Sequence, residues 1–196
     1  MRGLGRDHRG GRRVRRSWGR RRFGQGEYRY VNAPYPEPIE RLEAGPVSAA
    51  AADRAGLVGE ARPPWPETLD EWPEMCHAAG QTKSTAILSK YGDRDWNALH
   101  RDLYGELVFP LQVVINLDEP GIDHTGGEFL LPEQRPRAQS RGTATLLPHC
   151  HGYLFATHDR PVPSKRGWSA APVRHGVSAI GSGERHTLSP VFHAAC

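Results

Sequence analysis

Residues 173–188, VRHGVSAIGSGERHTL, carry the most informative pattern in the chain. Side chains alternate in character from 173 to 179, which is typical of a half-buried β-strand. The Gly-Ser-Gly at 181–183 is a turn signal. The pattern predicts an antiparallel hairpin centred on that turn, with His175 and Arg185 on one face and about 13 Å apart. A metal ion on His175, a five-carbon dicarboxylate and the side chain of Arg185 would together span this distance. Arginine forms two parallel hydrogen bonds to a carboxylate, which lysine cannot do.

Similar short strands follow one another from about residue 85 onward. The 17 prolines and 22 glycines of the chain fit a loop-rich, strand-rich fold better than a helical bundle. Turn signals separate eight candidate strands, at 85–88, 99–104, 107–117, 127–131, 142–147, 152–156, 173–180 and 185–192. This spacing predicts a two-sheet roll or barrel.

The preceding region has a different character. Residues 23–47 are rich in tyrosine and proline, which predicts an extended segment packed on the edge of the domain. A short helix is expected at 48–58 and a second at about 69–79, where Thr68 and Glu71 have capping-box spacing. Pro73 favours a start of the second helix a few residues later.

Charge is distributed unevenly along the chain. Residues 1–22 hold ten arginines and one acidic residue, a net charge of +9, so residues 23–196 carry −5 of the total of +4. An arginine-rich arm can bind nucleic acid, but we favour a solvated tail, or sequence translated upstream of the true start. The acidic remainder argues against a nucleic-acid-binding domain. We therefore expect a disordered arm (1–22), a helical and extended support region (23–84) and a β domain (85–196).

Cysteine content and hydropathy indicate the compartment. The three cysteines form no C-x-x-C pair, which argues against a disulfide framework and favours a reducing, cytoplasmic location. No apolar run is long enough to span a membrane. No apolar stretch follows the N-terminal charges, as a secretory signal would need. We expect a cytoplasmic protein with no membrane partner.

His100-Arg101-Asp102 is the main candidate for chemistry. On an extended strand the first and third residues project from the same face. One imidazole and one carboxylate, with His175 as the third ligand, form the facial triad of non-haem iron(II) sites, which leaves positions open for substrate and oxygen. Kinase catalytic loops share His-Arg-Asp, but they need Asn where this chain has Leu107. His149-Cys150-His151 is better interpreted as a solvated turn, because three adjacent residues cannot all face one metal ion.

These features together resemble the Fe(II)/2-oxoglutarate-dependent dioxygenase superfamily, within it the prolyl-hydroxylase-like group, and most closely an uncharacterised bacterial group of such oxygenases. The family pattern is H-x-D, a distant second histidine and an arginine ten residues later, as in His100/Asp102, His175 and Arg185. The stretch Thr125-Gly126-Gly127-Glu128-Phe129 and the strand at 141–147 are also similar to the family. The likeness covers about residues 65–193, whereas the Arg-rich start and residues 42–62 do not match it.

The resemblance implies a double-stranded β-helix (jelly roll), mainly β with flanking helices. It implies that His100, Asp102 and His175 are catalytic ligands of Fe(II) and that Arg185 binds 2-oxoglutarate. Dioxygen would be the second cosubstrate, with ascorbate as a candidate reductant. The hydroxylated substrate is unknown, and a prolyl or other protein side chain is the family-weighted expectation. The alternative is a non-catalytic jelly roll that binds a ligand, or nucleic acid through the Arg-rich arm.

Further polar residues are candidates for supporting roles. Gln112, and Tyr91 or Tyr104, could hydrogen-bond the oxo acid or a metal ligand. Thr187 or Ser189 could assist Arg185, and His124, just before the Gly-Gly turn, could rim the active site. Ordinary packing of the roll is the more conservative interpretation of each residue, and the sequence says nothing of the oligomeric state.

Overall fold

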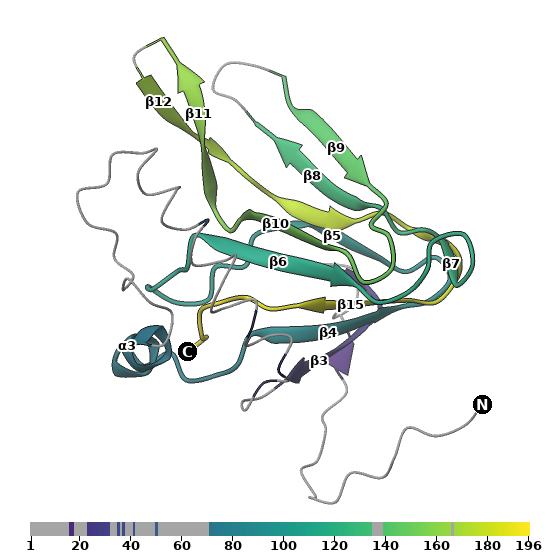
Figure 1. Ribbon diagram of the computed structural model, residues 1–196, viewed down its shortest axis with the longest axis horizontal. Helices are drawn as coiled ribbons and strands as arrows, with labels where there is room; N and C mark the ends of the chain where they lie inside the picture. Colours follow the sequence, from purple (N-terminus) through teal and green to yellow (C-terminus); the bar gives the residue numbers. More distant parts are fainter. Residues whose placement is uncertain are drawn as a thin grey trace, which may run out of the picture.

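The computed structural model is built mainly from antiparallel β-strands (Figure 1). It describes residues 16–17, 23–31, 35, 37, 41, 50, 71–134, 139–165 and 167–196. Two sheets contain most of the strands, and we call them the major and the minor sheet.

The major sheet has six strands. In spatial order they are β1 (Arg16–Ser17), β3 (Glu27–Val31), β4 (Ala86–Tyr91), β15 (Arg185–Ser189), β6 (Leu111–Asn116) and β10 (Gly152–Ala156).

The minor sheet has five strands. Its order is β2 (Gly24–Gln25), β5 (Trp96–His100), β13 (His175–Val177), β8 (Phe129–Glu133) and β9 (Arg141–Thr145). Two further pairs stand apart: β11 (Asp159–Ser164) with β12 (Gly167–Pro172), and β7 (His124–Gly126) with β14 (Ile180–Gly183).

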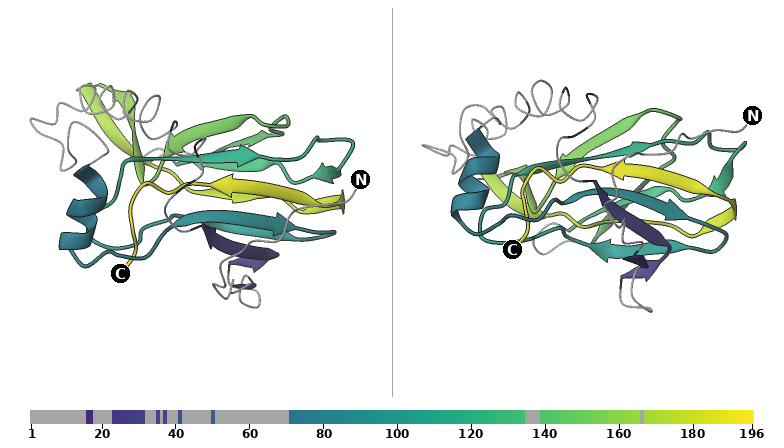
Figure 2. Two further views of the ribbon diagram at one scale, coloured as in Figure 1. Left: turned by 60° about the horizontal axis from the view of Figure 1, so that its bottom comes forward. Right: turned by 90° about the horizontal axis from the view of Figure 1, so that it is seen from below.

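The chain alternates between the two sheets. In chain order β4, β5, β6, β8, β9, β10, β13 and β15 lie in the major, minor, major, minor, minor, major, minor and major sheet. This winding defines a double-stranded β-helix, so the predicted fold class is confirmed. Figure 2 shows helix α3 (Trp72–Ala78) at one end of the roll, with the turns around β7 at the other end in Figure 1.

Two of the three hydrophobic clusters among the described residues lie on opposite faces of β6, because this strand buries both of its faces. On the outer face, Leu111 and Val113 pack with Trp72 of α3 and with Phe109. On the inner face, Val114 joins a second cluster with Phe129, Phe155 and Leu147, which draws residues from both sheets. Side chains alternate along a strand, so Val113 and Val114 point to opposite faces of β6. The inner cluster therefore holds the two sheets together, next to the strand face that lines the site.

The eight predicted strand segments each overlap a strand of the roll, although 99–104 overlaps β5 only at its first two residues. The pairs β11–β12 and β7–β14 were not predicted. The predicted hairpin joining His175 to Arg185 is wrong, because β13 pairs with β5 and β8 in the minor sheet whereas β15 pairs with β4 and β6 in the major sheet. The segment expected as its turn forms β14, which pairs with β7.

Helix α3 starts later than the predicted range of 69–79, as Pro73 suggested. Glu71 is the N-cap residue and makes no side-chain cap hydrogen bond, so its expected capping-box role is wrong. Pro73 lies in the first turn, where its missing N–H removes no helical bond. Within the described part of the chain, no helix is long and apolar enough to cross a bilayer.

The N-terminal predictions are tested only in part. The helix at 48–58 lies outside the described residues except for Ala50, which is helical. Of the arm, only Arg16–Ser17 is described, and this segment pairs with β3 as strand β1. The domain plan, including the disordered arm, stays a prediction. Tyr28 and Tyr30 of β3 pack edge to face near the sheet edge, as expected.

Candidate active site

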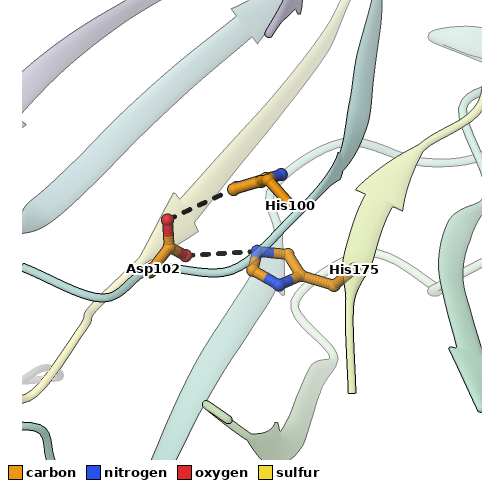
Figure 3. A group of neighbouring side chains, drawn as sticks. All are labelled: His100, Asp102 and His175. Carbon is orange, nitrogen blue, oxygen red and sulfur yellow. Dashed lines mark ion pairs between the residues drawn. The ribbon is translucent and has the colours of Figure 1, made fainter. Parts of the chain in front are cut away.

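His100, Asp102 and His175 converge at one end of the roll (Figure 3). His100 ends β5 and His175 begins β13, and the two are direct partners in the minor sheet. Asp102 lies in the loop just beyond β5, not on the strand as predicted. Its Oδ1 is 3.4 Å from His100 Nε2, and its Oδ2 is 3.2 Å from His175 Nε2. Strand pairing therefore brings together residues that are 75 positions apart in the sequence.

Neighbouring groups fix the orientation of the three side chains. His100 Nδ1 lies 2.7 Å from the carbonyl of Ala98, which turns Nε2 toward Asp102. The Tyr104 hydroxyl donates a 2.8 Å hydrogen bond to Asp102 Oδ1. The ring of Phe155 packs 4.8 Å from that of His175. Contacts of this kind set the tautomer and direction of a metal ligand.

Burial and charge set the protonation of the cluster. Burial acts to raise the pKa of Asp102, but hydrogen bonds and charges from the two histidines outweigh it and lower that pKa, so the carboxyl is ionised. Burial acts to lower the pKa of His100, but Asp102 overcomes it and the pKa is raised. Burial lowers the pKa of His175 despite Asp102. An ionised carboxylate and a neutral imidazole are the forms that bind a cation.

The geometry fits one shared metal ion. The three ligand atoms lie within 4.8 Å of one another. Two ligand atoms at right angles, each about 2.1 Å from an octahedral ion, lie about 3 Å apart, close to the separations observed here. Two imidazole nitrogens and one carboxylate oxygen form the set that non-haem iron(II) oxygenases use, with other positions left open. Zinc accepts similar donors, so the metal itself must be tested.

A pocket extends from these ligands between the two sheets. Alternate residues of two neighbouring major-sheet strands line its wall, namely Ile87, Ser89 and Tyr91 of β4 and Thr187 and Ser189 of β15. Its minor-sheet side includes both histidines. The pocket therefore has a metal end and an inner end, which is formed by Tyr91 and Thr187.

Arg185 lies beyond the inner end and does not itself line the pocket. It is the direct partner of Tyr91 and lies on the same face of β15 as Thr187, two residues along. The side chain is 1% exposed, and its Nη1 has no hydrogen-bond partner in the described structure. Burial lowers the pKa of Arg185, while Tyr91, Asp118 and Glu128 act to raise it. An anionic ligand would complete the pairing of Arg185, because a buried guanidinium is energetically costly unless it is paired.

Close packing beside Arg185 explains the Gly126-Gly127 motif. Gly127 has φ +74°, and a Cβ there would lie 2.5 Å from Ile180 Cδ1 and 2.9 Å from Arg185 Cδ. Any side chain at 127 would collide with the packing around the guanidinium. The motif therefore permits the close approach of this turn to Arg185.

Gln112 is the most distinctive of the candidate supporting residues. It lines the metal end of the pocket and is 2% exposed, and its Nε2 has no partner among the described residues. It pairs across the strands with Phe155, whose ring contacts His175. A buried amide N–H without a partner indicates an acceptor that is supplied from outside the protein. Sequence reasoning missed Phe155, although its position within the predicted strand 152–156 was a usable signal.

The other sequence candidates lie away from the three ligands. Cys150, at the centre of the His-Cys-His stretch, is exposed in a turn, as predicted. His124 is buried in β7, with Nδ1 3.1 Å from the carbonyl of Gly126, and does not line the pocket. Arg101 points away from the ligands, as expected, and donates to the carbonyl of Val173.

Comparison with known proteins identifies the class. A family model described as "Oxygenase, catalysing oxidative methylation of damaged DNA" matches residues 26–195. The chain therefore belongs to this oxygenase family, and the prediction of an oxygenase is confirmed.

Individual relatives give less detail. Two uncharacterised proteins of Mycobacterium tuberculosis, Rv2227 of strain H37Rv and MT2286 of strain CDC 1551, are each 70% identical over 132 residues. The match covers 67% of this chain and 57% of theirs, so the chain spans little more than half the length of these relatives.

Similar solved structures are distant. One is a prolyl-4-hydroxylase from Pseudomonas putida (TM-score 0.46, 16% identity, 91% of this chain and 77% of the other covered). Another is an oxidoreductase of the 2OG-Fe(II) oxygenase family from Burkholderia pseudomallei (TM-score 0.46, 14% identity, 93% and 74% covered). Neither likeness is close enough to assign a substrate.

Proposed function

We propose that this chain is an Fe(II)- and 2-oxoglutarate-dependent dioxygenase. One observation carries the proposal. Three ligand atoms within 4.8 Å of one another lie at one end of a pocket, and a buried guanidinium without a full set of partners lies behind its other end. A dianionic oxo acid is the simplest ligand that satisfies both ends.

The metal end would work through His100, Asp102 and His175. They would hold iron(II) and leave coordination positions open for cosubstrates. Tyr104 holds the carboxylate through its hydroxyl. When bound, iron with 2-oxoglutarate and dioxygen supplies an oxidation that releases succinate and carbon dioxide and inserts oxygen into a substrate C–H bond. The rings of Phe129 and Phe155 lie beside His175 and would limit the access of water to this end of the pocket.

The inner end would hold the far carboxylate of 2-oxoglutarate. Arg185 offers a bidentate pairing that compensates its buried charge. Thr187 and Ser189 lie between Arg185 and the metal ligands and could donate further hydrogen bonds. Gln112, at the metal end, would donate from Nε2 to the carboxylate nearest the metal.

The substrate class remains a proposal. Hydroxylation of a prolyl or other protein side chain stays a prediction from the sequence resemblance. Damaged DNA is the substrate named in the description of the family. The acidic balance of residues 23–196 argued against nucleic acid, but charge within that region is not uniform, as shown below.

Iron binding and turnover test the proposal together. The full chain, loaded anaerobically with iron(II), is expected to retain one iron per chain and to form succinate slowly from 2-oxoglutarate without added substrate, with ascorbate as reductant. His175→Ala should lose both properties. His149→Ala, in the exposed turn, is the matched control and should keep both. Zinc retention without succinate formation would instead favour the non-catalytic alternative.

A further inference from the structure

We propose that the β11–β12 hairpin is a binding surface for single-stranded DNA and delivers an unstacked nucleotide to the metal end of the pocket. This inference rests on the proposed function. It goes beyond the family description by assigning the surface and its residues.

The hairpin is joined directly to the metal ligands. Its base closes through a 2.8 Å hydrogen bond from Val173 N–H to the carbonyl of His158. Arg101, between two ligands, donates from Nε to the carbonyl of Val173 at 3.1 Å. His175 follows Val173 by two residues. Figure 1 shows the hairpin projecting outward from the roll beside β8 and β9.

Beyond Asp159, which lies at the base of the hairpin, one face of the hairpin is apolar and largely open. Strand alternation and register place Pro161, Pro163, Trp168 and Ala170 together on this face, which we call the Trp168 face. The opposite face carries Val162 and Ala171, which are both buried. Trp168 is 48% exposed although burial of an indole is strongly favourable. The hairpin thus uses one face for packing and presents an aromatic platform on the other.

The charge around this platform suits a polyanion. Residues 133–174 contain seven lysines and arginines and two acids, a net charge of +5, whereas the rest of residues 23–196 carries −10. Both acids already have cationic or imidazole neighbours, Glu133 with Arg160 and Asp159 with His158. Arg141, Lys165 and Arg174 are exposed. The acidic total of the domain therefore hides a positively charged stretch of sequence that includes the hairpin and ends just before His175.

An exposed indole on a hairpin that also carries cations is an arrangement that suits single-stranded nucleic acid. Bases stack on the aromatic ring whatever their sequence, while the cations follow the phosphates. A base that is already unstacked reaches an enclosed metal centre at lower cost than one within a duplex. A proline-rich or acidic peptide is the competing occupant of such a face.

Binding can be measured directly with the full chain. The probe is a fluorescein-labelled single-stranded DNA of about 15 nucleotides, followed by anisotropy at about 0.2 M salt, where contacts from the Arg-rich arm are weakened. Trp168→Ala should raise Kd about tenfold, and Lys165→Glu should raise it and reduce its salt dependence. Phe23→Ala and Arg94→Glu are matched controls at an exposed aromatic and a cation elsewhere, and should leave Kd unchanged.

Photocrosslinking locates the contact independently of affinity. DNA containing a halogenated uracil should crosslink to the tryptic peptide 167–174, which contains Trp168. Crosslinks confined to residues 1–22, an unchanged Kd in Trp168→Ala, or Trp168-dependent binding of a proline-rich peptide but not of DNA would each overturn the proposal.

A second readout separates this inference from the proposed function. Iron content and uncoupled succinate formation should be the same in Trp168→Ala as in the parent. If the parent fails to bind iron while DNA binding depends on Trp168, the oxygenase assignment fails and the DNA surface stands. If iron and succinate are normal but Trp168 is irrelevant, only the DNA surface fails.

Discussion

The metal end of the pocket and the surroundings of Arg185, behind the inner end, are built in opposite ways. At the metal end, three polar side chains from neighbouring minor-sheet segments contact one another, so each has a partner even without an ion. At the other end, one cation from the major sheet is buried with an unsatisfied Nη1. The first arrangement is compact and self-compensating, whereas the second is complete only when an anion arrives. Substitutions at the two ends should therefore differ in their effects on binding and on stability.

The largest effect is expected for Asp102→Ala. It removes a ligand and also the partner of both histidines, so iron affinity should fall by more than about 100-fold, beyond the 10–100-fold typical of residues that only support a ligand. Metal analysis after equilibrium dialysis measures this effect. The iron-free variant should also be less stable than the iron-free parent in urea unfolding. Iron retention equal to that of the parent would remove Asp102 from the ligand set.

Arg185→Met sharpens the contrast between the two ends. Loss of the bidentate pairing should raise the KM for 2-oxoglutarate about 100-fold, since truncating one partner of a buried charge pair costs about 2–5 kcal/mol. Removal of a buried charge that lacks a full set of partners should not lower the stability of the ligand-free protein. Steady-state succinate formation and urea unfolding measure the two quantities. An unchanged KM would show that the oxo acid does not reach this residue.

Tyr104→Phe tests the support of the metal end with a smaller change. It removes one hydroxyl that donates to Asp102. Iron affinity should fall about tenfold, with little change in the KM for 2-oxoglutarate. A competition titration with a chelator measures the affinity. Tyr153→Phe, a tyrosine of β10, serves as the control and should have no effect.

Gln112→Leu should have the smallest effect. It replaces an amide whose Nε2 has no partner with an apolar group of similar size, so the ligand-free protein should be at least as stable as the parent. The KM for 2-oxoglutarate should rise about fivefold through the loss of one hydrogen bond with a net value of about 1 kcal/mol. A rise in KM without loss of stability identifies a ligand-facing donor, whereas the reverse identifies ordinary packing.

The sequence predicted the roll and the ligand cluster for identifiable reasons. The strands of the roll have period-two patterns between strong turn signals, and H-x-D places two donors near each other whether the third residue is on a strand or just beyond it. The same local signals cannot assign a strand to a sheet. This is why His175 and Arg185 were expected in one hairpin, although β13 and β15 lie in different sheets.

The β11–β12 hairpin was not predicted because of its composition. Pro161, Pro163 and Pro172 argue against strands in the interior of a sheet, where each would remove a ladder donor. In an isolated two-stranded hairpin, each strand has one free edge, and proline is tolerated there. The positive net charge of residues 133–174 was also hidden, because a net charge summed over a whole domain cancels stretches of opposite sign.

Anaerobic titration of the iron-loaded chain with 2-oxoglutarate tests the central claim most directly. Chelation of iron(II) by the oxo acid produces a charge-transfer absorption band that neither component shows alone. The band should saturate at one 2-oxoglutarate per iron in the parent, need about 100-fold more oxo acid in Arg185→Met, and be absent in Asp102→Ala. A parent protein that binds iron but shows no band at any concentration of 2-oxoglutarate would contradict the account.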